Sequence, residues 1–383
     1  MLLLWLTVRP CLVIACAVAA LADAGAAQSV SSPAPTGTHR VGTLSLRLVD
    51  VSRSDPFLEN GTRRELMVRF WYPSAPTANC RLAEYGSPKV WAYFSQLSGF
   101  PLPNVTTHSC LNAAVAQVSH PVLIFSHGYT GTFTDSTFLA EDLASRGYVV
   151  VSIAHTYEST AVEFPDGRLI KSVFGSYLDG DSLRTDERSL RLARSVRLAD
   201  MKFVFDELQR LNRSGGPFAG KLDLSRAGVM GHSLGGEVAL SSLQRDPRLG
   251  TAVLLDAPIT DEDTGGTPKP LLILAAGRER WSNDECRLWS NLRGPRLAVN
   301  LRGAEHLTPT DAIWISEGVL GLVAPPETTR ANTTVAVIRK AVADFFDANL
   351  RGNTVRPITN VSFGHTAIVT LRNQALCREN PAW

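Results

Sequence analysis

Eight short apolar runs, rich in valine, isoleucine and leucine and bounded by turn residues, constrain the fold of this chain more than any other feature. They cover residues 43–49, 65–73, 121–128, 148–155, 226–233, 251–258, 270–277 and 296–303. Such runs are typical of strands buried on both faces of a sheet. Stretches with helical spacing lie between or after them, at 135–147, 189–211, 236–244 and 334–350. The alternation predicts an α/β fold with a mostly parallel central sheet of about eight strands, helices on both faces, and an antiparallel edge formed by the first two strands.

The N-terminal region has the layout of a secretory signal peptide over residues 1–27. The basic residue Arg9 precedes an apolar run, and small residues follow that run. A membrane anchor is the alternative, but the apolar run is shorter than the roughly 18 residues that a spanning helix needs. We therefore expect cleavage and a secreted or lumenal product.

The chain after the signal peptide is expected to form one domain behind a short leader. Residues 28–42 begin with a stretch that lacks apolar periodicity, so they predict a flexible leader, and 43–383 predict a single domain. Residues 156–188 match neither a strand nor a regular helix, and they contain a Pro-Asp-Gly turn sequence at 165–167. We interpret this stretch as a surface excursion near the C-terminal ends of the strands, where ligands bind in such sheets.

Charge and metal-ligand spacing exclude two classes of partner. The 38 basic and 36 acidic residues are interspersed along the chain, with a net charge of +2. No block of one sign exists to hold a phosphate backbone, so we expect no nucleic-acid partner. No CxxC or HxxxH spacing supports a zinc site, so we expect no metal and no cofactor.

Four cysteines follow the signal peptide, namely Cys80, Cys110, Cys286 and Cys377. In an oxidising compartment this even number predicts two disulfides. Of the three pairings, we prefer Cys80 with Cys110 and Cys286 with Cys377, because each pair lies within one flank of the chain; the sequence alone does not decide. Five Asn-x-Ser/Thr sequons would accept glycans in a eukaryotic secretory pathway, at Asn60, Asn104, Asn212, Asn332 and Asn360.

The motif that carries chemistry is Gly231-His232-Ser233-Leu234-Gly235. This G-x-S-x-G pattern follows an apolar strand and precedes a helix, which is the context that a nucleophile elbow requires. In such an elbow the serine lies in a strained turn that tolerates only small neighbours, and its hydroxyl projects above the sheet. The alternative is a glycine-rich turn that only packs a helix on a strand. The context favours Ser233 as a nucleophile.

A serine hydroxyl needs a histidine to accept its proton. His306 and His365 are the two histidines that follow Ser233 by enough chain to come from a later strand. His306 follows the last of the eight runs directly, whereas His365 lies beyond the final helix, so we favour His306. His127 and His232 neighbour the expected site, but their sequence positions favour a structural role.

A carboxylate must stand behind the histidine to orient it. Asp256 closes the strand that follows the elbow, and a charge at the end of a buried strand needs a partner. Glu279 and Asp284, which follow the next strand, are its rivals. The alternative for Asp256 is a helix cap or a turn residue. We predict Asp256 as the acid.

An oxyanion hole needs two backbone N–H donors. Leu234, the residue after the nucleophile, would supply one. Tyr129 would supply the other, because it follows Gly128 at the end of an earlier strand and that glycine permits the required turn.

These motifs together resemble the plasma and intracellular type II platelet-activating-factor acetylhydrolases, of the α/β-hydrolase superfamily. The resemblance covers roughly 43–310 and rests on FSHGYTG, LAEDLASRGYVVVSIAH, RLADMKFVFDEL, GHSLGGE, LLDAP and RGAEH. Carried over by position, the nucleophile of that family falls on Ser233, its acid on Asp256, its base on His306, and its oxyanion donors on Tyr129 and Leu234. The chain departs from the animal enzymes in 156–188 and in its two expected disulfides.

The resemblance implies an α/β-hydrolase fold and a secreted serine ester hydrolase that acts through an acyl-enzyme. The implied substrate is the short or oxidised sn-2 acyl group of a phospholipid, with transient contact to lipid surfaces. A broad carboxylesterase, lipase or cutinase-like polyesterase is the near alternative, because 156–188 would shape the substrate entrance. A catalytically silent binding protein on the same fold is the distant one.

Overall fold

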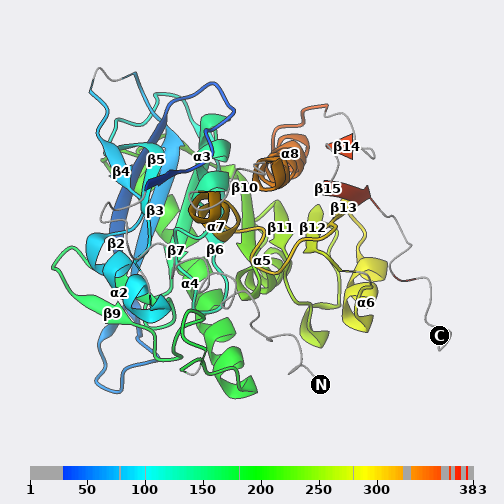
Figure 1. Cartoon of the computed structure of the whole chain (residues 1–383), viewed down its shortest axis with the longest axis horizontal. Helices are drawn as coiled ribbons and strands as arrows, with labels where there is room; N and C mark the ends of the chain where they lie inside the picture. The colour runs from blue at the N-terminus through cyan, green and yellow to red at the C-terminus, as the bar shows by residue number, and fades with distance from the viewer. Residues whose placement is uncertain are drawn as a thin grey trace.

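The fold comes from a computed structural model of the chain, which describes residues 29–76, 79–99, 101–180, 182–278, 280–321, 329–354, 362–363, 367–371 and 377. The eight apolar runs form strands at the expected places (Figure 1). These strands are β2 (Val41–Ser54), β3 (Arg63–Pro73), β6 (His120–Ser126), β7 (Val149–Ala154), β10 (Leu222–His232), β11 (Thr251–Leu255), β12 (Leu271–Ala276) and β13 (Arg296–Leu301).

Further strands extend this sheet at both ends. They are β1 (Ser29–Ser31), β4 (Leu82–Glu84), β5 (Asn104–Leu111), β14 (Ser362–Phe363) and β15 (Ala367–Leu371). Within the described residues the sheet runs in the order β1-β5-β2-β3-β7-β6-β10-β11-β12-β13-β15-β14, with β4 paired to β5. The pairs from β7 to β13 are parallel, and the β2–β3 pair is antiparallel as predicted. The prediction that β2 and β3 form the edge is wrong, because β5 pairs with β2 on its outer side.

The central strands are buried on both faces, which explains their unbroken apolar sequences. In β6, Leu123 and Phe125 join one hydrophobic core, whereas Val122 and Ile124 join the other. Successive side chains of a strand point to opposite faces of the sheet. The interior positions of such a strand are therefore apolar on both faces, as residues 121–125 of β6 are.

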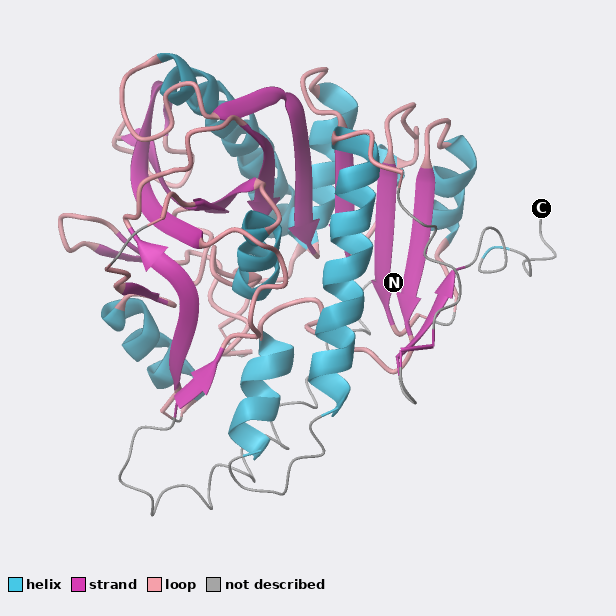
Figure 2. Ribbon diagram, turned by 90° about the horizontal axis from the view of Figure 1, so that it is seen from above, coloured by secondary structure: helices cyan, strands magenta, loops and turns pink. Residues whose placement is uncertain are grey.

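Helices supply the outer layers of both cores (Figure 2). On one face lie α3 (Thr137–Ser145), α7 (Ala312–Gly321) and α8 (Thr329–Leu350), which contribute Phe138, Trp314 and Phe346. On the other lie α4 (Glu187–Arg213), α5 (Leu234–Arg245) and α6 (Asn283–Asn291), which contribute Phe205, Leu240 and Trp289. The remaining described helices are α2 (Pro88–Ser98) and the short η1 (Asp261–Asp263). The arrangement is the α/β-hydrolase fold that the sequence predicted.

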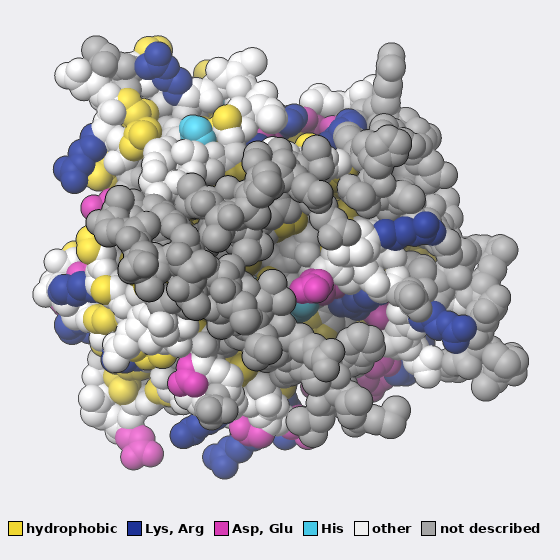
Figure 3. All heavy atoms as spheres, in the orientation of Figure 1, with side chains coloured by type: hydrophobic (Ala, Val, Ile, Leu, Met, Phe, Trp, Pro, Cys, Tyr) yellow, Lys and Arg dark blue, Asp and Glu magenta, His cyan; other side chains and the backbone are white. Residues whose placement is uncertain are grey.

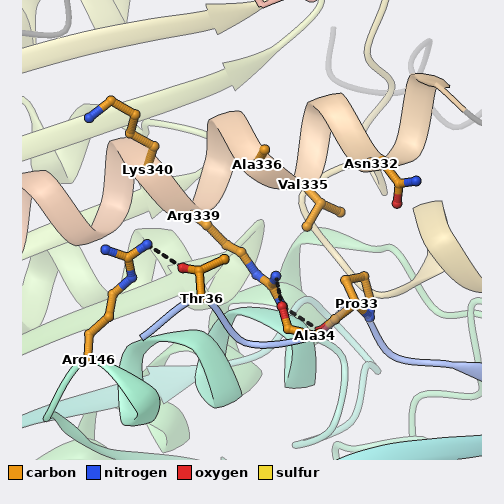
Figure 4. A pocket seen from close by; sticks show the side chains of 9 residues that line it. All are labelled: Pro33, Ala34, Thr36, Arg146, Asn332, Val335, Ala336, Arg339 and Lys340. Carbon is orange, nitrogen blue, oxygen red and sulfur yellow. Dashed lines mark hydrogen bonds between the residues drawn. The ribbon is translucent and has the colours of Figure 1, made fainter. Parts of the chain in front are cut away.

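The segment predicted as a flexible leader, 28–42, is instead packed on the domain over its described residues. Ser29–Ser31 form β1, and Val41 begins β2. Between these strands Arg339 of α8 donates to the carbonyls of Pro33 and Ala34, each at 2.8 Å (Figure 4). The segment is held by hydrogen bonds from a buried side chain to its backbone carbonyls. Apolar periodicity does not detect such contacts, so the sequence suggested a flexible leader.

The 156–188 excursion folds over the C-terminal ends of the central strands. It contains a small hairpin of β8 (Ala161–Glu163) and β9 (Leu169–Lys171), and the expected turn lies at its tip. Its first residues are largely buried rather than on the surface, because they pack on the loop after β6: Ser159 Oγ lies 2.7 Å from His127 Nε2, and Thr160 donates its N–H to Gly131 O at 3.2 Å.

Both preferred disulfides are present, Cys80–Cys110 and Cys286–Cys377. Among the described helices, none has the length and apolar character needed to cross a bilayer. On the face drawn in Figure 3, basic and acidic side chains are scattered among each other.

Candidate active site

Ser233 lies in a sharp turn between β10 and α5, with φ 53° and ψ −125°. A positive φ is strained for any residue other than glycine, at a cost of about 1–3 kcal/mol. The two flanking glycines make this turn sterically feasible. A Cβ at Gly231 would lie 2.2 Å from Gly235 O, and one at Gly235 would lie 2.0 Å from Ser126 O. The local structure is therefore the elbow that the G-x-S-x-G pattern predicted.

The structure brings together the three side chains predicted as nucleophile, base and acid. His306, in the loop after β13, places Nε2 at 2.9 Å from Ser233 Oγ and Nδ1 at 2.6 Å from Asp256 Oδ2. An ionised carboxylate only accepts hydrogen bonds, so Nδ1–H donates to Asp256 and Nε2 is left to accept the serine proton. The His306 side chain is half exposed, whereas that of Asp256 is 6% exposed. The arrangement can deprotonate a serine next to solvent, as nucleophilic acyl transfer requires.

Asp256 is held as an anion by its neighbours. Burial alone would raise the pKa of its carboxyl group, but the hydrogen bond with His306 and the positive charge of Arg278 lower that pKa to about 2. Arg278 Nε and the N–H of Ala276 each donate to Oδ1 at 3.0 Å, which leaves Oδ2 for His306. The guanidinium of Arg278 also pairs with Glu285, which is buried.

Arg278 is a site residue that the sequence reasoning missed. It lies two residues beyond β12, at the same edge of the sheet as the end of β11. Its place just after a strand is the only feature in the sequence that could have indicated a role in the site. The direction of its side chain toward Asp256 depends on the folded backbone.

His232 positions the loop that carries His306. Its Nε2 lies 2.8 Å from the carbonyl oxygen of His306, and the two rings are 4.8 Å apart. Because a carbonyl can only accept, Nε2 carries the proton. Burial and then the nearby His306 lower the pKa of His232 to about 3, so the ring is neutral. His127 also has a pKa well below its usual value, chiefly through burial, and its Nδ1 lies 2.7 Å from the carbonyl oxygen of Gly128.

The two predicted oxyanion donors flank the elbow. Leu234 begins α5, and its N–H is one of the unpaired donors at the N-terminus of that helix. Tyr129 follows Gly128 in the loop after β6, and a Cβ at Gly128 would lie only 3.6 Å from Ser233 Cβ. Within the described residues, neither N–H has a protein acceptor.

An apolar cluster borders these donors. Phe174, Ala193 and Leu234 form its buried part, and Phe57 and Tyr129 pack against it. The rings of Phe57 and Tyr129 each lie 5.6 Å from that of Phe174. Since Phe174 belongs to the 156–188 excursion, that segment supplies part of the wall beside the site.

Of the residues that rival Asp256 as acid and His306 as base, one lies outside the site and two are not among the described residues. Asp284 is on α6 and pairs with Arg287. His365 and Glu279 lie outside the described residues. Within the part of the chain that the structure describes, no group of three or more histidine, cysteine or acidic side chains has the arrangement of a metal site.

Comparisons with known proteins bear on this site. The model of the family described as platelet-activating factor acetylhydrolase, isoform II, matches residues 24–165 and 205–353. A probable 1-alkyl-2-acetylglycerophosphocholine esterase from Arthroderma benhamiae is 27% identical over 45% of this chain and 41% of its own length. A platelet-activating factor acetylhydrolase from Bos taurus is 24% identical over 67% of this chain and 63% of its own length. The matches thus span less than two thirds of each of these two relatives.

A solved structure is similar over more of the chain. A ferulic acid esterase from Streptomyces cinnamoneus is 33% identical, with a TM-score of 0.71, over 90% of this chain and 99% of that structure.

Proposed function

The chain belongs to the platelet-activating factor acetylhydrolase, isoform II, family and is a carboxylic ester hydrolase, and from this membership we propose that it works through a serine acyl-enzyme. The proposal assigns Ser233 as nucleophile, His306 as base and Asp256 as the acid that orients it. The observation that carries it is the pair of hydrogen bonds that links these residues, at 2.9 Å and 2.6 Å, within an elbow at the strand ends.

In the proposed mechanism, His306 Nε2 takes the proton of Ser233 as its Oγ attacks the ester carbonyl carbon. The carbonyl oxygen becomes an oxyanion bound by the N–H groups of Tyr129 and Leu234. When the tetrahedral intermediate collapses, His306 returns the proton to the leaving alcohol, and an acyl-enzyme remains. Water then attacks this ester with His306 again acting as base, which releases the acid and restores Ser233.

For the substrate, we propose the short or oxidised sn-2 acyl group of a phospholipid. The family model and the acetylhydrolase relatives support this choice. A broad carboxylesterase or cutinase-like polyesterase is the second candidate. The solved ferulic acid esterase favours the second candidate, because it covers more of the chain at higher identity than those relatives.

A panel of esters separates the two candidates. It comprises a 2-acetyl phospholipid, phospholipids of graded sn-2 chain length, p-nitrophenyl esters of the same acyl groups, and methyl ferulate. The first candidate requires the highest kcat/KM on the short-chain phospholipid and a steep loss as the chain lengthens. Equal or higher values on the p-nitrophenyl esters or on methyl ferulate would reject it in favour of the second. Stoichiometric labelling of Ser233 by an organophosphate tests the mechanism common to both and rejects the silent binding protein.

We also propose that the protein is secreted after cleavage near residue 27, as one domain that makes transient contact with lipid surfaces. The signal-peptide layout and the two disulfides support secretion. N-terminal sequencing of the exported protein tests it. Of the sequons, Asn212 is an unfavourable glycan acceptor, since its side chain donates to Leu222 O and accepts from Leu222 N–H, at 2.8 Å and 3.0 Å.

A further inference from the structure

A fully buried ion pair lies beneath the loop that follows β6. The side chains of Arg197, on α4, and Glu158, in the excursion, are 0% and 1% exposed. Arg197 Nε lies 3.0 Å from Glu158 Oε2, and Nη2 lies 2.6 Å from Oε1. A buried ion pair is often no more stabilising than apolar residues of similar volume, because both charges lose their hydration. We therefore expect the Arg197–Glu158 pair to have a role other than stabilising the fold.

Arg197 also binds two successive carbonyl groups of that loop. Its Nη1 donates to His127 O, and its Nη2 donates to Gly128 O at 2.9 Å. In a trans peptide unit the C=O and the N–H point in opposite directions. The C=O of Gly128 shares its peptide unit with the N–H of Tyr129. Gly128 O also accepts the N–H of Gly131 at 2.9 Å, so the guanidinium and this turn hydrogen bond together direct the Tyr129 N–H away from Arg197.

Glu158 holds the next peptide unit. Its Oε1 accepts the N–H of Thr130 at 3.0 Å. Thr130 has φ 52°, a left-handed conformation that is unfavourable for a β-branched residue and persists only where the surroundings impose it. The ion pair therefore binds the groups on both sides of the Tyr129 N–H and leaves that N–H without a protein acceptor among the described residues.

We propose that Arg197, paired with Glu158, is a positioning residue for the oxyanion donor Tyr129. This inference rests on the proposed function, in which the Tyr129 N–H binds the oxyanion beside Ser233. Arg197 touches no substrate in this role. It orients a peptide unit before the reaction begins, which is the condition for a hydrogen-bond donor to favour the transition state over the substrate.

Arg197→Lys tests the proposal because lysine keeps the charge but cannot replace the planar fork that reaches two carbonyls and a carboxylate. We expect kcat to fall by about 10- to 100-fold while KM changes by less than about threefold. The inhibition constant of a trifluoromethyl ketone with the matching acyl chain should rise by a similar factor, because this ketone forms a tetrahedral oxyanion adduct with the serine.

Arg64→Lys is the matched control. Arg64 is equally buried and pairs with Asp55 and Asp200, but its carbonyl partner is Thr156, outside the loop after β6. This control should lose stability and keep kcat and the inhibition constant within about twofold of wild type.

A folded Arg197→Lys protein that matches Arg64→Lys in both kcat and the inhibition constant would overturn the proposal. If Arg197→Lys does not fold, Glu158→Gln replaces it, because the amide keeps an acceptor for Thr130 but loses the charged pairing. A loss of about tenfold in kcat with a parallel rise in the inhibition constant is then expected, and unchanged values would overturn the proposal. Failure of the proposed function would appear separately, as wild-type protein whose Ser233 an organophosphate does not label.

Discussion

The turn at Ser233 depends on the space at its flanking glycines, and the Ser233 side chain makes no hydrogen bond that caps α5. Replacing the hydroxyl by hydrogen should therefore leave the turn intact. Ser233→Ala should therefore remain folded and lose about 10⁴- to 10⁶-fold in kcat. Ser242→Ala is the control, since this buried hydroxyl of α5 has no hydrogen-bond partner among the described residues. Wild-type-like melting of both proteins, with activity lost only in the first, is the expected result. More than a few per cent of residual activity in purified Ser233→Ala would contradict the assignment.

The acid can be identified by isosteric amides. In Asp256→Asn the amide oxygen keeps the donors Ala276 and Arg278, and the NH2 group replaces the oxygen that accepts from His306. The Nδ1–H tautomer of His306 then loses its acceptor, so we expect a loss of at least about 100-fold in kcat. Glu279→Gln, at the rival position, should change kcat by less than about tenfold. Steady-state kinetics of both folded variants gives the comparison. The reverse ranking would move the acid to Glu279 and leave Ser233 and His306 in their roles.

Asp256 also predicts a pH dependence of stability. Its folded pKa of about 2 lies below its value in the unfolded chain, so its ionised form stabilises the fold above that unfolded value, and the contribution is lost as the pH falls through the folded pKa. The difference in unfolding free energy between wild type and Asp256→Asn should shrink by about 1 kcal/mol between about pH 6 and pH 3. Urea denaturation at several pH values measures it. A constant difference would show that the carboxyl group is not held as an anion.

At the scale of elements, the sequence predicted the strands that carry long apolar runs and missed those whose buried positions are partly polar. β5 is an example, because Thr107 donates to Ala83 O and Ser109 donates to the buried carboxylate of Glu141. Its buried positions are therefore partly polar, and its sequence resembles a loop. Arg278 and Arg197 were not predicted for a different reason. Their roles depend on the direction of a side chain in the folded protein, whereas the predicted triad residues follow strand ends or a motif.

The N-terminal segment offers a test of its packing on α3. A Cβ at Gly37 would lie 2.2 Å from the backbone oxygen of Ser145, and this neighbour is not a flexible side chain. Gly37→Ala should therefore lower the unfolding free energy by about 1–3 kcal/mol, with kcat unchanged. Gly215→Ala, where nothing lies within 4 Å of the added Cβ, should stay within about 0.5 kcal/mol of wild type. Equal denaturation midpoints for the two variants would mean that the segment is the flexible leader first expected from the sequence.

At the scale of the whole molecule, the two disulfides lie in different flanks of the sheet. Cys80–Cys110 ties the loop before β4 to β5, next to β1, and Cys286–Cys377 ties α6 to the chain beyond β15. Among the described residues, none of the four cysteines forms a hydrogen bond with Ser233, Asp256 or His306. We therefore expect the bonds to act on stability and to leave catalysis at the strand ends unchanged.

The last prediction separates the two bonds by the length of chain that each closes. The sequence separations are 30 and 91 residues. If a disulfide stabilises mainly by restricting the unfolded chain, removing Cys286–Cys377 should cost about 1 kcal/mol more than removing Cys80–Cys110. Denaturation of the two paired Cys→Ala variants measures this difference, with kcat as the control for the site. Thiol counting on the denatured, unreduced wild type should first find no free thiol. Any stoichiometric free thiol would contradict the prediction that all four of these cysteines are paired.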